Sequence, residues 1–270
     1  MDYDFKNISV EVSGKRARFT LNRPEKKNPL NWDTVRELRI AAEQINKNHE
    51  QVMTVVIIGS GDSFSAGGDL EKYLELFENP DDFSGFMEEF YRLFCAVEKS
   101  HAVYIAAING VCVAGGLEVL LACDVVIANE SARIGDGHLN FGQLPGAGSS
   151  IRAWRAIGTH NAKHLIFTGD LLPARRAYEL GLVQEVAPDA DFDAAIKTLE
   201  EKIHRKSPVS VKGVKHLMNR AVYESLEQGL RTEMRYVHRY ATTEADPMEG
   251  LLAFRDKRKP TFGKKKRPKP

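Results

Sequence analysis

The chain has 270 residues, of which 43% are hydrophobic and 28% charged, and its formal net charge is +1. This length is sufficient to bury a substantial core, as one large domain or as a main domain with a small second one. No apolar run approaches the ~18 residues that would cross a bilayer, which argues against a membrane-spanning protein. Cys95, Cys112 and Cys123 lie in apolar surroundings. We therefore expect reduced cysteines in a cytoplasmic protein, without a disulfide or a metal site.

The last seven residues are strongly basic. They include Lys264, Lys265, Lys266, Arg267 and Lys269, so the rest of the chain carries a net negative charge. A tail of this kind could contact nucleic acid or another anionic surface. Because no aromatic residue is interleaved with the basic ones, we expect no nucleic-acid partner. Residues 264–270 are predicted to be a disordered, solvated end.

Periodicity predicts short strands alternating with helices in the first two thirds of the chain. Residues 8–21 alternate as a β-hairpin would, with a turn near Gly14, and residues 31–48 carry an apolar face of helical spacing. The apolar run 52–58 predicts a buried strand. The later elements are a helical stretch over 70–100 broken at 79–80, a strand over 103–108, a helix over 116–122, a strand over 125–128, a glycine-rich loop over 129–150 and a helix that begins at 149–152. This repetition indicates an α/β fold.

After about residue 190 the sequence predicts only helices. Three amphipathic segments cover residues 194–205, 208–228 and 229–243. Their apolar side chains include Leu217, Met218, Leu226, Leu230, Met234, Tyr236 and Val237. A lone helical appendage cannot bury so many apolar side chains, so we expect part of this surface to be a subunit interface.

Two glycine-rich turns each follow a predicted strand. The first spans residues 63–70 and the second residues 108–118. A glycine turn between a strand and a helix exposes backbone N–H groups at the positive end of the helix dipole. Two such turns that converge would form an oxyanion hole, with Glu118 beside it as an acid or a base. Taken singly, such glycines merely permit tight turns.

These turns are part of a longer pattern that resembles the crotonase (enoyl-CoA hydratase/isomerase) superfamily. The matching segments follow the family's order and spacing. They are residues 21–31, the two glycine turns, 123–128, 141–148, 168–183 and 249–260. The resemblance implies a crotonase-like spiral of ββα units over residues 1–192 and a C-terminal helical trimerisation region over residues 193–263. It also implies homotrimers or dimers of trimers, and a coenzyme A thioester as substrate with no further cofactor.

The resemblance assigns the oxyanion-hole donors to the backbone N–H groups of Ala66 and Gly115. Glu118 falls at the place of the first of the family's two catalytic glutamates. An acid at the start of a helix can be an ordinary surface residue favoured by the dipole. Here its sequence neighbours are apolar, and a buried glutamate needs a partner or a purpose. We therefore predict a pocket acid with a tuned pKa.

The main departure from the family pattern is His138, which stands at the place of the second glutamate. A histidine titrates near neutrality and can donate or accept a proton, so acid–base chemistry remains possible. The alternative is a structural histidine that shapes the pocket by hydrogen bonding. Asp136 or Asn140 could orient the ring or meet a polar substrate, and Asp136 could itself be the working acid.

Coenzyme A is expected to bind along the first glycine turn and at two basic segments. The family places the adenine against backbone near that turn, and nearby lysines could meet the phosphates. The candidate residues are Lys26, Lys27, Ala66, Gly67, Gly68, Asp69, Leu70, Phe254 and Lys257. Any one of the charged side chains in this set could instead simply be exposed to solvent. The aromatic residues of 71–100 suit a bulky acyl group, although they could also simply be core.

The leading hypothesis is an enoyl-CoA hydratase-type lyase that forms a thioester enolate and adds water across a 2,3 double bond. Glu118 would activate the water, and His138, or a group it positions, would supply the proton. With His138 as a base, the same hole could instead cleave a C–C bond of a β-diketone or a cyclic β-ketoacyl-CoA. Isomerisation and decarboxylation stay open because they need only one proton carrier. The second class of hypothesis is a non-catalytic acyl-CoA-binding or RNA-binding protein of the same fold. The presence of Glu118 and of both glycine turns argues against it.

Overall fold

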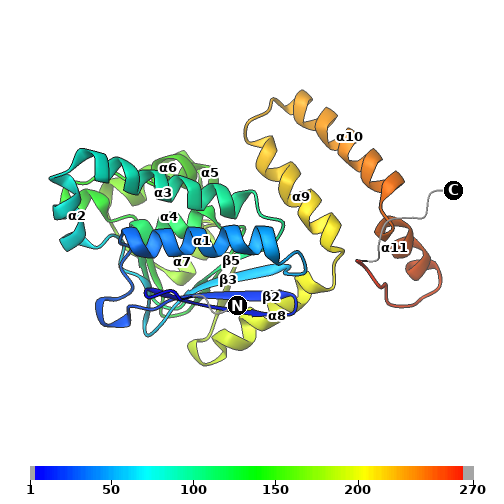
Figure 1. The fold of residues 1–270 in the computed structure, drawn as a ribbon, viewed down its shortest axis with the longest axis horizontal. Helices are drawn as coiled ribbons and strands as arrows, with labels where there is room; N and C mark the ends of the chain where they lie inside the picture. The colour runs from blue at the N-terminus through cyan, green and yellow to red at the C-terminus, as the bar shows by residue number, and fades with distance from the viewer. Residues whose placement is uncertain (1–3, 264–270) are drawn as a thin grey trace.

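A six-stranded sheet forms the centre of the chain between residues 4 and 263, the part that this computed structural model describes (Figure 1). Its strands are, in spatial order, β1 (Ile8–Ser13), β2 (Arg16–Leu21), β3 (Thr54–Gly59), β5 (Val103–Ile108), β7 (Val125–Asn129) and β10 (Glu185–Ala187). β1 and β2 form the expected antiparallel hairpin, and the other neighbouring pairs are parallel.

Alternate residues of the central strands contribute to two separate apolar clusters. Val55 and Ile57 of β3 point to one face of the sheet, and Val56 and Ile58 to the other, as the two-residue period of a strand requires. The first face is covered by α1 (Trp32–Asn48) and α3 (Pro80–Glu98), and the second by α8 (Phe192–His204). Because both faces are buried, the sequence of β3 is continuously apolar.

A second, smaller sheet is built from strands that the sequence pattern did not reveal. It consists of β4 (Ser63–Ser65), β6 (Val111–Val113), β8 (Arg133–Gly135) and β9 (Leu172–Pro173). Each strand is too short to show alternation. β4, β6 and β8 follow β3, β5 and β7 along the chain, so strand pairs and helices repeat as in a spiral of ββα units. The loop expected over 129–150 is wrong in part, because it contains β8 and the 3-10 helix η2 (His138–Phe141).

Several helices of the core begin where a side chain caps them. The Asn31 side chain accepts a hydrogen bond from the Thr34 N–H at the start of α1, and Asn79 caps α3 directly before Pro80. This cap separates α3 from α2 (Leu70–Phe77), which confirms the predicted break. The remaining helices of this part are η1 (Pro24–Lys26), α4 (Gly115–Ala122), α5 (Ser149–Ile157), α6 (Thr159–Thr168), α7 (Ala174–Glu179) and η3 (Asp189–Asp191).

Three helices leave the sheets as a C-terminal arm: α9 (Pro208–Ala221), α10 (Leu226–Thr243) and α11 (Asp246–Arg255) (Figure 1). The expected junction at residue 228 is wrong, because Ser225 and Gln228 form a capping box that starts α10. α8 falls within the expected C-terminal region but packs on the main sheet, so the arm begins at α9. The basic tail over 264–270 lies outside the described residues.

Between residues 4 and 263, no helix has the length and apolar character that a bilayer crossing needs. Over the same residues, no histidine, cysteine, aspartate and glutamate side chains group as metal ligands would. All three cysteines are free thiols.

A buried lysine fastens the arm to the core. Lys215 of α9 is only 7% exposed. Its Nζ donates to the carbonyl oxygens of Val97 and Ala102, each at 2.8 Å, and to Asp124 Oδ2 at 2.7 Å. These acceptors satisfy all three ammonium protons, which a buried cation requires.

We expect Lys215→Met to lower the free energy of unfolding by about 3–5 kcal/mol, because it leaves the Asp124 carboxylate without its buried partner. Lys212→Met, an exposed position on the same helix, is the matched control and should change stability by less than about 0.5 kcal/mol. Urea unfolding of both variants measures the difference. Equal stabilities would show that the contact between Lys215 and Asp124 does not hold the arm.

Candidate active site

Glu118 is buried in the first turn of α4, directly after the second glycine turn. The residue is only 2% exposed. Oε1 accepts hydrogen bonds from the backbone N–H groups of Ala147, at 2.7 Å, and Ser149, at 3.1 Å. These donors belong to the turn before α5 and to the first residue of α5, so the positive end of that helix faces the carboxylate. Oε2 is left to face the rest of the site.

Asp136 and His138 reach the same point from the end of β8. His138 Nδ1 lies 3.0 Å from Asp136 Oδ1, which also accepts the His138 backbone N–H at 3.2 Å. On the other side of the ring, Nε2 lies 3.9 Å from Glu118 Oε2. The imidazole therefore stands between two carboxylates that are far apart in the sequence. The structure brings together the three residues that the sequence singled out for acid–base chemistry.

The electrostatics of this group favour a charged histidine. Burial is the largest influence on Glu118 and raises its pKa, while His138 and the two N–H donors oppose the rise. Burial alone would lower the pKa of His138, but the hydrogen bond to Asp136 and the charges of Glu118 and Asp136 together raise it. Burial would raise the pKa of Asp136, but the bond and charge of His138 outweigh it and lower that pKa. The two shifts therefore favour an ionised Asp136 beside a protonated ring.

The expected role of Ala66 in the oxyanion hole is wrong. Its N–H donates to the carbonyl oxygen of Lys27 at 2.8 Å and is not available to a substrate. The reason is a strand-like pairing between residues 27–30 and 66–69, in which Leu30 and Gly68 form a parallel bridge. Such pairing directs alternate N–H groups to the neighbouring segment and the intervening one away from it.

The N–H groups that this pairing leaves free belong to Gly68 and Gly115. Within residues 4–263 neither amide donates a hydrogen bond to another group. The two glycines lie side by side, since a Cβ on Gly115 would stand 3.9 Å from the Gly68 nitrogen. Gly115 is the first residue of α4, whose amide has no partner inside the helix. The structure therefore keeps Gly115 as a candidate donor and replaces Ala66 by Gly68.

The candidate coenzyme A residues divide into two groups. Lys26, Lys27 and the segment 66–70 lie together near the start of α2. Lys26 pairs with Glu71 at 3.0 Å on the surface. Phe254 lies in the last turn of α11 and Lys257 two residues beyond that helix, which is far from α2 in Figure 1. A single chain thus does not bring the two groups together.

Asp69 has a structural partner that the sequence did not reveal. Its carboxylate accepts a hydrogen bond from Arg23 at 2.9 Å, and Asp69 is buried. This ion pair joins the segment before η1 to the start of α2. Asp69 is therefore occupied in holding the first glycine turn, since its backbone N–H also donates to the carbonyl oxygen of Leu30 at 3.2 Å.

The aromatic residues expected to line a pocket are divided between core and site. Phe86 and Phe90 are fully buried in the apolar cluster that α1 and α3 share. Tyr73 of α2 lies against Gly68 so closely that a Cβ there would stand 1.9 Å from its ring. Burial and, to a smaller extent, the charge of Glu118 raise the pKa of Tyr73, which keeps its hydroxyl protonated. Of these aromatic side chains, Tyr73 is the one that borders the proposed hole.

An apolar pocket of about 520 Å³ adjoins the segment that carries His138. Its wall includes Leu139, Leu144 and Pro145 on one side and Trp154 and Phe167 on the other. The sequence did not predict it, because its lining comes from a turn and from helices α5 and α6, whose apolar residues resemble ordinary core positions.

Comparison with known proteins places this geometry in a family. The family model for enoyl-CoA hydratase/isomerase matches residues 13–265. A probable enoyl-CoA hydratase of Mycobacterium tuberculosis is 33% identical over 96% of this chain and 98% of its own length. A short-chain-enoyl-CoA hydratase of Clostridium acetobutylicum is 33% identical over 95% of this chain and 97% of its own.

Solved structures give the same result for the fold. The crystal structure of an enoyl-CoA hydratase from Bacillus anthracis has a TM-score of 0.89 and 33% identity, and covers 95% of this chain and 99% of its own. An enoyl-CoA hydratase from Polaromonas has a TM-score of 0.90 and 27% identity, with coverage of 95% and 99%. The chain therefore belongs to the enoyl-CoA hydratase/isomerase family.

Proposed function

We propose that this protein adds water across the 2,3 double bond of an enoyl-CoA thioester. The observation that carries the proposal is the closeness of Glu118 and His138 beside two unpaired backbone amides. Hydration needs one group that takes a proton from water and one that gives a proton to carbon. Glu118 and His138 supply both, and the related proteins named as hydratases support this activity.

The N–H groups of Gly68 and Gly115 stabilise the oxygen of the thioester as it becomes an enolate. Their positions are fixed by the strand pairing and by the start of α4, so no reorganisation is needed when charge develops. Each donor of this kind is typically worth about 3 kcal/mol of the barrier. Gly115 also lies at the positive end of α4, which favours a negative charge there.

Glu118 Oε2 accepts a proton from water as the water oxygen bonds to C3. The C2–C3 π pair moves toward C2, and the resulting enolate takes a proton from His138 Nε2. The products are the 3-hydroxyacyl thioester, a protonated Glu118 and a neutral His138. Glu118 Oε2 and His138 Nε2 are 3.9 Å apart, which is beyond hydrogen-bond distance, so the proton returns from Glu118 to His138 through a solvent water. This restores the starting state, and the net change is the addition of one water.

Asp136 allows His138 to donate the proton while Glu118 accepts one. The family's second catalytic glutamate is replaced by an imidazole, which delivers a proton readily only if it is charged at the working pH. The short contact to Asp136 Oδ1 fixes the ring and favours the imidazolium form. The same contact turns Nε2 toward Glu118. We therefore assign to Asp136 the positioning of His138 rather than the role of the working acid.

Cleavage of a β-diketone or cyclic β-ketoacyl-CoA is not favoured. It would require His138 as a base, in the neutral form, whereas both neighbouring carboxylates raise its pKa. Isomerisation and decarboxylation need only one proton carrier. Either reaction would leave Glu118 or His138 without a role in proton transfer. The non-catalytic alternatives do not account for a buried glutamate held against a histidine.

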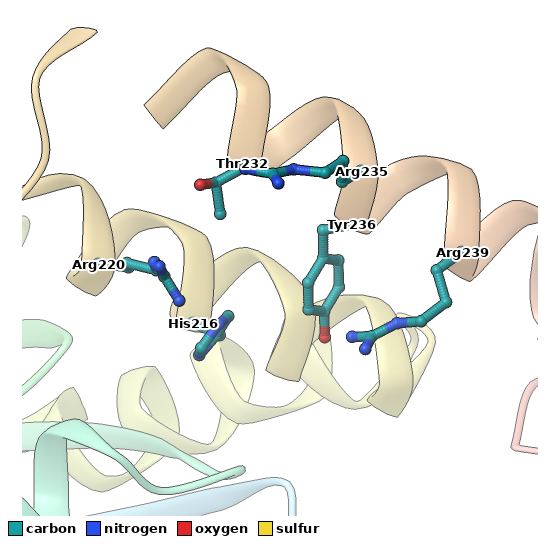
Figure 2. A pocket seen from close by; sticks show the side chains of 6 residues that line it. All are labelled: His216, Arg220, Thr232, Arg235, Tyr236 and Arg239. Carbon is teal, nitrogen blue, oxygen red and sulfur yellow. The ribbon is translucent and has the colours of Figure 1, made fainter. Parts of the chain in front are cut away.

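The exposed apolar side chains of α10 support a homotrimer or a dimer of trimers. Leu226, Leu230, Met234 and Val237 recur at helical spacing, and each is more than half exposed. The other side of α10 is polar: Tyr236 and Arg239 point toward α9, into a pocket that also contains Arg220 and His216 (Figure 2). We propose that the apolar stripe packs against a second copy, which would also let Phe254 and Lys257 reach a neighbour's coenzyme A site.

Glu118→Gln should lower kcat by about 10²–10⁴-fold, because the amide cannot accept the proton of water. The loss of enoyl absorbance from a short-chain enoyl-CoA measures the rate. Glu130→Gln, at an exposed position, is the control and should leave the rate unchanged. Undiminished turnover in Glu118→Gln would refute the assignment of the base.

The pH–rate profile should be bell-shaped. Activity is lost as the pH falls through the pKa of Glu118, raised above 4.5, and as it rises through that of His138, raised above 6.5. Asp136→Asn removes the charge that supports the imidazolium, so it should move the alkaline limb to lower pH. Asp33→Asn, which is exposed, should leave the limb in place. An alkaline limb unmoved by Asp136→Asn would remove Asp136 from the mechanism.

Replacing Leu230 and Met234 together by glutamate should dissociate the oligomer, since the change puts charge into the apolar stripe. Light scattering coupled to size exclusion measures the mass. Thr243→Glu introduces a negative charge on the opposite side of α10, at an exposed position, and should keep the wild-type mass. A double variant of unchanged mass would place the interface elsewhere.

A further inference from the structure

Ser149 contacts the proton-transfer group in a way that the proposed mechanism has not used. It is the first residue of α5 and is fully buried. Its backbone N–H donates to Glu118 Oε1 at 3.1 Å. The side chain of the same residue therefore lies at the carboxylates, not at the surface.

Two buried polar atoms at this place have no hydrogen-bond partner within the described residues. One is the hydroxyl oxygen of Ser149 and the other is Asp136 Oδ2. A hydroxyl donates and a carboxylate oxygen accepts, so the two atoms are complementary. Leaving both unpaired in the interior is costly, whereas pairing them removes both penalties.

Both residues belong to the same group of contacts, since Ser149 donates to Glu118 and Asp136 holds the ring that faces Glu118. Burial raises the pKa of Asp136; His138 lowers it most, and the Ser149 hydroxyl contributes to the same lowering. Asp136 Oδ1 is already used twice by His138, through the ring and through the backbone N–H. Oδ2 is thus the oxygen that remains for Ser149, whose hydroxyl can turn toward an acceptor by rotation about its side-chain torsion.

We propose that Ser149 is a positioning residue whose hydroxyl donates a hydrogen bond to Asp136 Oδ2 and so fixes the carboxylate that holds His138. The inference rests on the proposed function of His138 as the proton donor. Ser149 then serves both carboxylates of the site, Glu118 through its backbone and Asp136 through its side chain. One residue at the start of α5 sets the distance across which the proton must return.

The charged groups around His138 determine what a missing hydroxyl would do. Asp136 faces the ring from the end of β8 and Glu118 faces it from α4, while Tyr73 of α2 faces Glu118. Of these three groups, only Asp136 loses a hydrogen bond when the Ser149 hydroxyl is removed. Its ionised form is then less stable. The imidazolium then loses part of its support, and its titration moves to lower pH.

The test is the titration of His138 in Ser149→Ala, followed by ¹⁵N NMR of the ring nitrogens in the protein without ligand. We expect the midpoint to fall by roughly half a pH unit, and the alkaline limb of the pH–rate profile to fall with it. The rate below that limb should stay within about threefold of wild type, because Ser149 does not touch the reacting atoms. Asp136→Asn gives the larger shift for comparison, and Ser131→Ala, with an exposed hydroxyl, should give none.

The outcomes separate this inference from the proposed function. A His138 midpoint that is unchanged in Ser149→Ala but lowered in Asp136→Asn would overturn the role of Ser149. A lowered midpoint in a protein that hydrates no enoyl-CoA would keep that role and reject the hydratase. If Ser149→Ala does not fold, Ser149→Cys provides the same test with a side chain of similar size that is a much weaker donor.

Discussion

The burial of one carboxylate by two backbone amides is the constraint on which the site depends. Glu118 can lie in the interior only because Ala147 and Ser149 donate to one of its oxygens and the start of α5 points toward it. That arrangement fixes the α4–α5 spacing and leaves the other oxygen facing His138. The glycine turn before α4 places the Gly115 amide one helical turn from the same carboxylate. The proposed base and the proposed oxyanion donor therefore both come from a single strand–turn–helix unit.

The proposed proton donor at position 138 is a histidine where the family pattern has a glutamate, which alters the charge of the site but leaves a group that can transfer a proton. Two carboxylates at this distance would share a proton because like charges oppose each other. An imidazolium between Glu118 and Asp136 is instead attracted by both, so the site carries its proton in a defined place. This arrangement requires a second buried carboxylate, that of Asp136. Its Oδ1 is hydrogen-bonded to the His138 ring and to the His138 backbone N–H.

The sequence predicted what depends on local pattern and missed what depends on pairing. The central strands, α1, α2 and α3, and the closeness of Glu118, Asp136 and His138 followed from periodicity and from the family pattern. The short strands of the second sheet did not, because two or three residues show no period. The donor at the first turn was misplaced for a related reason: which of Ala66 and Gly68 has a free N–H depends on the bridge to Leu30. The contacts of Arg23 and Lys215 join distant segments and leave no local signal.

The central claim is that His138 is a charged acid held by Asp136 beside Glu118. The most direct test is ¹⁵N NMR of the His138 ring in the wild-type protein at pH 7, which distinguishes the protonation state of each nitrogen. We predict that both nitrogens carry a proton. A neutral ring with a bare Nε2 would contradict the account, because His138 would then be a base and the site would be suited to a different reaction.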